Sequence, residues 1–167
     1  EPMKTLYLLR HAKSSWDDDQ LNDAERPLTR RGKRDCGLVA HQLERNRKKF
    51  QQVFCSSANR CQETLQRFRT ESDVFDHAEI HTTEDLYTFD MQQLLTWLKE
   101  LGNQYDNALI IGHNPALFDL VNYLYDGKLD QLGTCTFVEL EINVEYWDQL
   151  RPDSAKLQDL IRPKQLR

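Results

Sequence analysis

Four residues of this chain, two histidines and two arginines, have the types and the placement that phosphoryl transfer requires. Arg10 and His11 come directly after an apolar run near the N-terminus, and His113 follows a second such run. Arg60 lies shortly after a third. If these runs are strands of a parallel sheet, their carboxyl ends meet at the edge where α/β proteins bind ligands. We therefore expect the four side chains to converge on one pocket.

Each of these residues has a chemical role that suits a phosphoryl group. A neutral ring nitrogen of His11 can attack phosphorus and form a phosphohistidine that water then hydrolyses. Its other ring nitrogen is expected to donate to a backbone carbonyl, which fixes the tautomer. Arg10 and Arg60 are candidate clamps, because guanidinium groups match phosphate oxygens. Each residue alone is more often structural, so the prediction depends on their occurring together.

The same residues give the chain a resemblance to the histidine phosphatase superfamily. Four segments carry it, in order: RHAKS at 10–14, RPLTRRG at 26–32, SSANRCQET at 56–64 and GHNP at 112–115. The chain looks most like the small branch of SixA-type phosphohistidine phosphatases, over residues 5–163. The resemblance implies a phosphoglycerate-mutase-like fold, whose mixed sheet has one antiparallel strand. It also implies that His113 contacts the phosphoryl group opposite His11, and that Arg26 borders the substrate groove.

The expected activity is a phosphatase that forms a covalent intermediate on His11. Its substrate would be a phosphomonoester or a protein phosphohistidine. Two alternatives remain open: a phosphatase or mutase-like enzyme for a small phosphorylated metabolite, and a non-catalytic phosphate-binding module. The intact set of Arg10, His11, Arg60 and His113 argues against the module, since a binder needs no nucleophile.

Several further residues are secondary candidates. Ser57 and Asn114 could bind phosphate, but each could equally cap a helix. The general acid is harder to assign, because larger members of the superfamily take it from an insertion that this chain is too short to hold. Glu84 and Asp85 are the possible acids here, whereas Asp90 is better interpreted as a helix cap.

Other kinds of site fit the sequence less well. A cysteine phosphatase needs five residues between its nucleophile and its arginine, and only four separate Cys55 from Arg60. His77 and His81 have metal-compatible spacing, but no further ligand pattern completes a site. Two arginines and a second histidine would supply the positive charge that a metal provides elsewhere. We therefore expect catalysis without a metal or other cofactor.

Strand-like and helix-like segments alternate along the chain, which predicts a single α/β domain over residues 1–167. Its architecture should be three-layered, with helices on both faces of a mostly parallel sheet. The expected strands are 5–9, 52–56, 78–81, 107–111 and 136–142. The expected helices are 29–47, one capped by Ser57, 91–101, and one in which Asn114 is the cap and Pro115 the first residue. The tail from residue 152 has no clear pattern.

Composition limits the partners and the compartment. Of 167 residues, 39% are hydrophobic and 29% charged, as in an ordinary globular protein. A net charge of −5 argues against nucleic-acid binding. No apolar run is long enough to cross a bilayer, and the N-terminal run does not resemble a signal peptide. We therefore expect a cytoplasmic protein whose four cysteines are free thiols.

Overall fold

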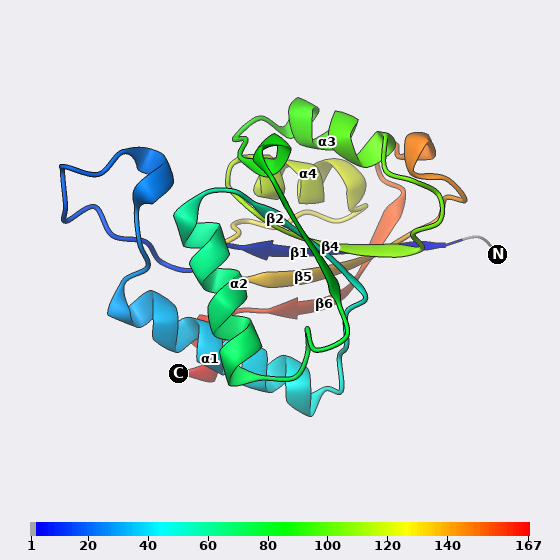
Figure 1. The fold of residues 1–167 in the computed structure, drawn as a ribbon. Helices are drawn as coiled ribbons and strands as arrows, with labels where there is room; N and C mark the ends of the chain where they lie inside the picture. The colour runs from blue at the N-terminus through cyan, green and yellow to red at the C-terminus, as the bar shows by residue number, and fades with distance from the viewer. Residues whose placement is uncertain (1–2) are drawn as a thin grey trace.

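The computed structural model describes residues 3–167, and over this range it contains a six-stranded sheet flanked by helices (Figure 1). The bounds, in chain order, are β1 Lys4–Arg10, α1 Arg30–Arg45, β2 Gln52–Ser56, α2 Asn59–Glu71, β3 Glu79–Thr83, α3 Met91–Lys99, β4 Asn107–Gly112, α4 Ala116–Leu124, β5 Phe137–Ile142 and β6 Ala155–Ile161. The predicted strands and helices are therefore confirmed, with shifted ends. The unassigned tail forms β6 and a short 3₁₀ turn, Pro163–Leu166.

The strands lie in the order β3-β2-β4-β1-β5-β6. Neighbouring strands are parallel except where β5 pairs with β1 and with β6. One strand, β5, thus runs against the others, as the resemblance implied. The last residues of β1, β2 and β4 consequently lie at one edge of the sheet, and this edge carries the candidate site.

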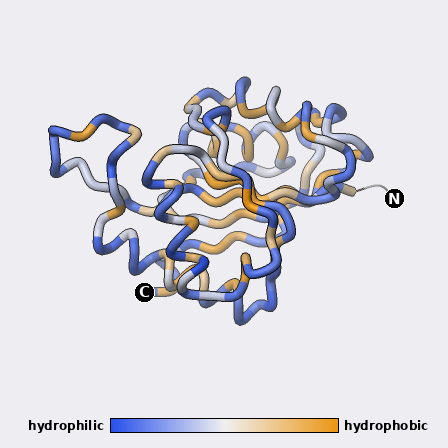
Figure 2. Tube along the Cα trace, viewed as in Figure 1, coloured by the Kyte–Doolittle hydropathy of each residue, from blue (hydrophilic) through white to orange (hydrophobic). Residues whose placement is uncertain are grey.

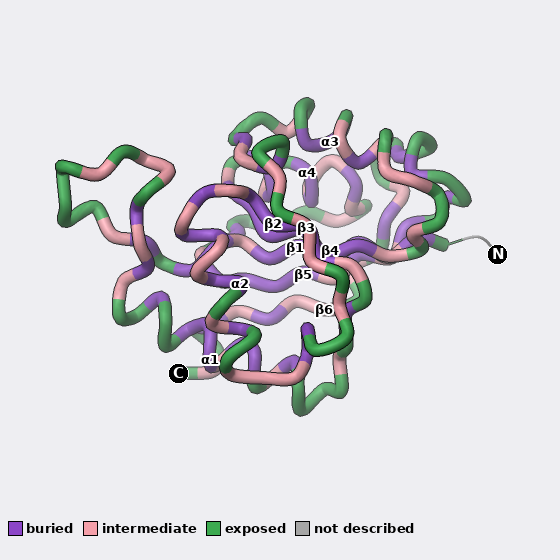
Figure 3. The backbone as a smooth tube through the Cα atoms, viewed as in Figure 1, coloured by how far each residue is buried: buried purple, intermediate pink, exposed green. Residues whose placement is uncertain are grey.

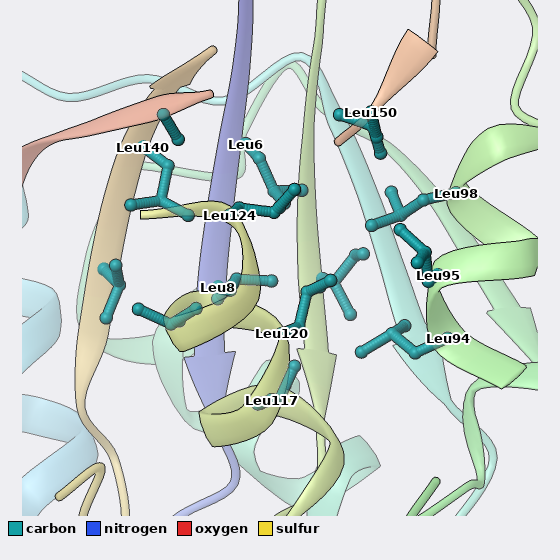
Figure 4. Close-up of a cluster of buried hydrophobic side chains, with 14 of the residues drawn as sticks. Leu6, Leu8, Leu94, Leu95, Leu98, Leu117, Leu120, Leu124, Leu140 and Leu150 are labelled. Carbon is teal, nitrogen blue, oxygen red and sulfur yellow. The ribbon is translucent and has the colours of Figure 1, made fainter. Parts of the chain in front are cut away.

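Helices cover both faces of the sheet, which confirms the three-layer α/β/α architecture. In Figure 1, α1 and α2 lie on one face and α3 and α4 on the other. Side chains along β1 alternate between the two faces of the sheet. Leu6 and Leu8 pack against α3 and α4, whereas Leu9 packs against α1 and α2. Figure 4 shows Leu6 beside Leu124 and Leu8 beside Leu120, both of α4.

The strands form the apolar centre of the molecule. They are mostly hydrophobic in Figure 2 and mostly buried in Figure 3, whereas exposed polar residues follow the outer faces of the helices. The helical faces expected from 3.6-residue periodicity are also buried: Cys36, Val39, Ala40 and Leu43 in α1, and Cys61, Thr64, Leu65 and Phe68 in α2. Full burial of one such large apolar side chain stabilises the fold by about 1.5–3 kcal/mol.

The helix caps agree with the sequence in two cases. Thr29 caps α1 by accepting a hydrogen bond from the backbone amide of Gly32, at 2.9 Å. Asp90 caps α3 through the amide of Gln92, at 3.0 Å. Gln93, three residues after Asp90, does not complete a capping box, because its side-chain oxygen accepts from the hydroxyl of Thr88.

Two expected caps are wrong in detail. Helix α2 begins after Ala58 and not after Ser57, and it is Ser56 whose hydroxyl accepts the Ala58 amide at 3.2 Å. Helix α4 begins one residue later than expected, so that Pro115 is the cap residue. Asn114 still serves the helix, because its side-chain oxygen accepts from the Phe118 amide at 3.2 Å.

The segment between β1 and α1 projects beyond the sheet edge (Figure 1). It is mostly loop, with a 3₁₀ turn at Asp23–Glu25. Asn22 and Glu25 form a reciprocal capping box there. No helix within residues 3–167 combines the length and apolar character needed to cross a bilayer.

Candidate active site

One pocket of about 360 Å³ at the carboxyl edge of the sheet contains all four residues singled out from the sequence. Arg10 and His11 come from the end of β1, Arg60 from the first turn of α2, and His113 from the end of β4. His11 and His113 are 102 positions apart in the chain, and they share one cavity because parallel strands end at the same edge of the sheet.

The ring of His11 is held in one tautomer. Its Nδ1–H donates to the carbonyl oxygen of Ala12 at 2.7 Å, so that Nε2 keeps its lone pair. The Nε–H of Arg60 donates to that Nε2 at 3.3 Å. The neighbouring Ala12 amide is itself fixed, because it donates to the Thr64 hydroxyl at 3.0 Å.

The environment of His11 also favours the neutral ring. Burial lowers the pKa of His11 to about 4, and the positive charges of Arg60 and Arg10 act in the same direction. These effects outweigh the hydrogen bond to Ala12, which raises this pKa. At neutral pH the Nε2 atom is therefore unprotonated and carries a lone pair.

His113 faces His11, with ring centroids 5.4 Å apart. Its Nε2 lies 2.8 Å from the Ser56 hydroxyl, whereas its buried Nδ1 has no hydrogen-bond partner within residues 3–167. Burial is the main cause that lowers the pKa of His113 to about 3, and the proximity of His11 and Arg60 contributes to the same shift. The ring packs against both Tyr87 and Phe89, which also contact each other. A second neutral imidazole with an unused nitrogen thus faces the first.

The two arginines differ in their partners. Arg10 donates through Nη1 to the carbonyl oxygen of Leu132 at 3.1 Å, and its buried Nε has no partner within the described residues. Burial lowers the pKa of Arg10, as does the charge of Arg60. Arg60 is 2% exposed and, besides its bond to His11, donates to the backbone oxygen and the carboxylate of Asp23 at 2.8 and 3.0 Å.

Asp23 is the functional candidate that the sequence analysis missed. Its carboxylate lies in the pocket and also accepts from Arg26, at 3.1 Å, and from the Tyr87 hydroxyl. Partial burial raises the pKa of this carboxyl, but the hydrogen bonds from Tyr87, Arg60 and Arg26 outweigh it and lower the pKa to about 2. The loop of residues 14–29 contains five acidic residues, and nothing in the sequence distinguishes Asp23 from the others.

Arg26 and Asn114 also line the pocket. The guanidinium of Arg26 donates to the Ser14 hydroxyl at 2.6 Å and to the Ser15 carbonyl at 3.0 Å, and it stacks 3.2 Å from the centre of the Trp16 ring. Asn114 donates to the Leu132 carbonyl at 2.7 Å. Both side chains therefore organise the pocket wall through contacts within the protein.

Three of the predicted site residues lie elsewhere. Ser57 is not among the residues that line the pocket, and the neighbouring Ser56 provides the hydroxyl that reaches His113. Glu84 and Asp85 lie exposed in a 3₁₀ turn and line a separate cavity of about 630 Å³. The carboxylate inside the pocket of His11 is that of Asp23, which comes from the loop before α1.

The geometry supports neither a cysteine-phosphatase site at Cys55 nor a metal site at His81. Burial raises the pKa of the Cys61 thiol to about 12, and burial likewise raises the pKa of Cys55. A buried, protonated thiol is a poor nucleophile. His81 lies against Phe54 and contacts Gln52. Within residues 3–167, no three side chains of His, Cys, Asp or Glu are grouped so as to hold a metal ion.

Comparison with known proteins places these residues in a family. The model of the histidine phosphatase superfamily (branch 1) matches residues 6–109. An uncharacterized chloroplastic protein of Arabidopsis thaliana is 30% identical over 171 residues, which covers 96% of this chain and 78% of that protein.

Solved structures show the same fold over nearly the whole chain. A protein described as phosphohistidine phosphatase SixA from Nakamurella multipartitia superposes with a TM-score of 0.81, at 23% identity, over 98% of both chains. The protein histidine phosphatase SixA complexed with tungstate superposes with a TM-score of 0.79, at 20% identity, over 98% of this chain and 99% of that one. This chain belongs to branch 1 of the histidine phosphatase superfamily.

Proposed function

We propose that this protein is a phosphatase that hydrolyses phosphohistidine on a substrate protein through a phosphohistidine intermediate on His11. The observation that carries the proposal is the state of the His11 ring. Its Nδ1–H is bound to the Ala12 carbonyl and its pKa is about 4, so an unprotonated Nε2 faces the guanidinium of Arg60.

In the first step the lone pair of Nε2 of His11 forms a bond to phosphorus. The bond between phosphorus and the substrate's imidazole nitrogen breaks, and its electron pair stays on that imidazole. In the second step a water oxygen attacks phosphorus, and the electron pair of the breaking bond returns to Nε2. The proton of the water goes to the phosphate product or to solvent. Two displacements replace one more difficult step.

The charged groups of the pocket stabilise the transferring phosphoryl group. Arg10 has an unpartnered Nε, and Arg60 uses three of its five N–H bonds within the protein. Both can therefore donate to phosphoryl oxygens. If the Ser56 hydroxyl donates to Nε2 of His113, the Nδ1–H of His113 is available for the same purpose. Donors already in place act on the charge that spreads over these oxygens.

The protonation state of Asp23 favours a phosphoramidate substrate. Among the described residues that line the pocket, Asp23 alone carries a carboxyl group, and its pKa is about 2. It is therefore ionised and cannot protonate a leaving group at neutral pH. An imidazole that already carries a proton on its other nitrogen leaves without an acid, whereas an alkoxide requires one. The names of the SixA neighbours point to the same substrate class.

A substrate panel tests this function. We would measure phosphate release from a phosphohistidine peptide, an aryl phosphate and a sugar phosphate, with wild type, His11→Gln, and His77→Gln as a matched exposed control. The peptide should be hydrolysed at least about 100-fold faster than the sugar phosphate, because only the latter needs an acid. His11→Gln should abolish release.

The panel also separates the alternatives. Faster hydrolysis of the sugar phosphate would assign the enzyme to small metabolites instead. Phosphate binding without release from any substrate would indicate the non-catalytic module.

A further inference from the structure

A cavity of about 260 Å³ is lined by basic side chains. It lies beside the pocket that holds Arg10, His11, Arg60 and His113, which we call the catalytic pocket. They come from the start of α1 and from the chain that follows β6: Arg31, Arg162, Lys164 and Arg167. These elements are far apart in sequence but adjacent in the fold, where the C-terminus lies against α1 (Figure 1). We call this cavity the basic pocket.

The basic pocket and the catalytic pocket share a wall. Thr134 lines both of them. Another cavity, of about 310 Å³, borders both pockets. It shares Arg10 and Asn114 with the catalytic pocket, and Gln131 and Gly133 with the basic pocket. The three cavities are therefore neighbours along the groove side of the sheet edge, since each shares lining residues with the other two.

Neighbouring peptide units tie the two sites together. Arg10 donates to the carbonyl oxygen of Leu132 at 3.1 Å, and Arg162 donates to that of Gln131 at 3.4 Å. A phosphate clamp and a residue of the basic pocket are therefore anchored one residue apart on the same segment. A ligand in one pocket lies close to a ligand in the other.

The basic pocket has more positive charge than its surroundings neutralise. No described residue that lines it has an acidic side chain, although the whole chain carries a net charge of −5. The buried Asp35 lies nearby and binds Arg167 through both carboxylate oxygens, at 3.2 and 2.8 Å; Arg31 lies 3.8 Å from it. The single negative charge of Asp35 is therefore shared between the guanidinium groups of Arg167 and Arg31.

The other two cations lack a counter-charge. Arg162 and Lys164 form no ion pair within residues 3–167, and the buried Nε of Arg162 has no hydrogen-bond partner there. Cations gathered against the sign of the whole chain attract an anionic ligand.

We propose that the basic pocket is a second anion-binding subsite, which receives carboxylates of the substrate protein while the phosphohistidine occupies the catalytic pocket. This inference rests on the proposed function and adds a substrate class to it: a phosphohistidine flanked by acidic side chains. A protein surface can present two such groups across the groove. A small substrate with a second phosphate would use the same chemistry, and the experiment distinguishes the two sources.

The test uses a charge-reversed double variant, Arg162→Glu with Lys164→Glu. Its matched control is Arg151→Glu with Lys156→Glu, which changes the net charge equally. Lys156 lies at the opposite edge of the sheet, since it pairs with Glu141 near the far end of β5, whereas Ile161 pairs with Phe137. Arg162→Gln with Lys164→Gln is the conservative second variant, and circular dichroism checks the fold of each.

Four substrates are compared by steady-state kinetics: a phosphohistidine peptide with Asp and Glu flanks, the same peptide with Asn and Gln flanks, an aryl phosphate, and a small compound that carries two phosphates. The reversed variant should raise KM for the acidic peptide by about tenfold with kcat unchanged, since rim charges act on encounter and binding. The neutral peptide and the aryl phosphate should be unaffected, and the control variant should match wild type.

The remaining outcomes would overturn the proposal in whole or in part. An unchanged KM for the acidic peptide, or an equal loss on all of the substrates, would overturn the subsite. A selective loss on a small bisphosphorylated compound, with no loss on the acidic peptide, would overturn the protein source.

A binding measurement keeps this test separate from the proposed function. Fluorescence anisotropy of the unphosphorylated acidic peptide needs no catalysis. Wild type should bind it about tenfold more tightly than the reversed variant does, even if the panel showed no phosphatase activity. Equal binding by the two proteins would overturn the subsite alone.

Discussion

The Nε–H of Arg60 donates to Nε2 of His11 across 3.3 Å, so the attacking atom of the proposed nucleophile and a phosphate clamp already contact each other. A cation beside this nitrogen disfavours protonation, which lowers the pKa of His11 further than burial alone does. In the proposed mechanism, the oxygens of an entering phosphoryl group offer Arg60 better acceptors, which frees the lone pair of His11 to attack phosphorus.

The two active-site histidines should remain neutral well below their usual range. With pKa values of about 4 for His11 and about 3 for His113, neither ring should titrate between pH 5 and 8. Imidazole NMR signals as a function of pH measure this, and the urea-unfolded protein is the control, with histidines near the ordinary ~6.5. A midpoint for His11 near the unfolded value would contradict the electrostatic argument.

The same shifts predict acid sensitivity of the fold. Because the pKa of His11 is lower in the folded than in the unfolded protein, the unfolded chain binds more protons between about pH 6.5 and 4. Stability should therefore fall as pH drops through that window, with His11 contributing about 3 kcal/mol to the fall. Urea unfolding at pH 7 and pH 4.5, compared with His11→Gln, measures this contribution. An equal acid response in the two proteins would contradict it.

Removing the charge of Asp23 should strengthen phosphate binding. Its carboxylate occupies donors of Arg60 and Arg26 and repels an incoming phosphate. Asp23→Asn keeps the side-chain shape and should lower the inhibition constant of inorganic phosphate about fivefold, or roughly 1 kcal/mol.

The matched control is Glu84→Gln, which removes a carboxylate outside the pocket and should leave this constant unchanged. Weaker phosphate binding by Asp23→Asn would show instead that the carboxylate mainly holds Arg60 in place.

Gly32 permits the close approach of α1 to the backbone beside His11. A Cβ at this position would lie 2.3 Å from the Lys13 carbonyl oxygen, so Gly32→Ala should destabilise the fold by about 1–3 kcal/mol and reduce kcat. Gly37→Ala on the same helix is the control, since its Cβ would meet only the Glu71 side chain at 3.4 Å. Thermal unfolding with a kinetic assay measures both variants, and equal stability of the two would contradict the steric argument.

The sequence predicted the central strands and the helix faces because short-range patterns determine them. Apolar runs that end at Arg10, Ser56 and Gly112 give β1, β2 and β4 directly. Strand β6 was not predicted, because its polar and apolar residues do not alternate regularly. Its burial alternates irregularly, and its pairing with β5 contains a register shift between Glu139 and Leu140.

The candidate site was predictable where residues follow strands and unpredictable where a loop folds back. Arg10, His11 and His113 are placed by strand ends, so their convergence follows from a parallel sheet. Asp23 reaches Arg60 only because the loop of residues 14–29 returns over α2. Ser56 and Ser57 are adjacent and chemically identical, and the start of α2 at Asn59 decides which hydroxyl faces His113.

The most direct test of the mechanism is to trap a phosphoryl group on His11 during turnover. Phosphohistidine is labile in acid and comparatively stable in base, so the reaction is quenched in alkali and the labelled residue is identified by mass spectrometry. The label should lie on His11 in wild type and be absent from His11→Ala, which should also lose turnover. His113→Ala should still be labelled but turn over about 10²–10³-fold more slowly, as expected when one preorganised stabilising group is removed. Near-normal turnover by His11→Ala, or a label on another residue, would contradict the mechanism.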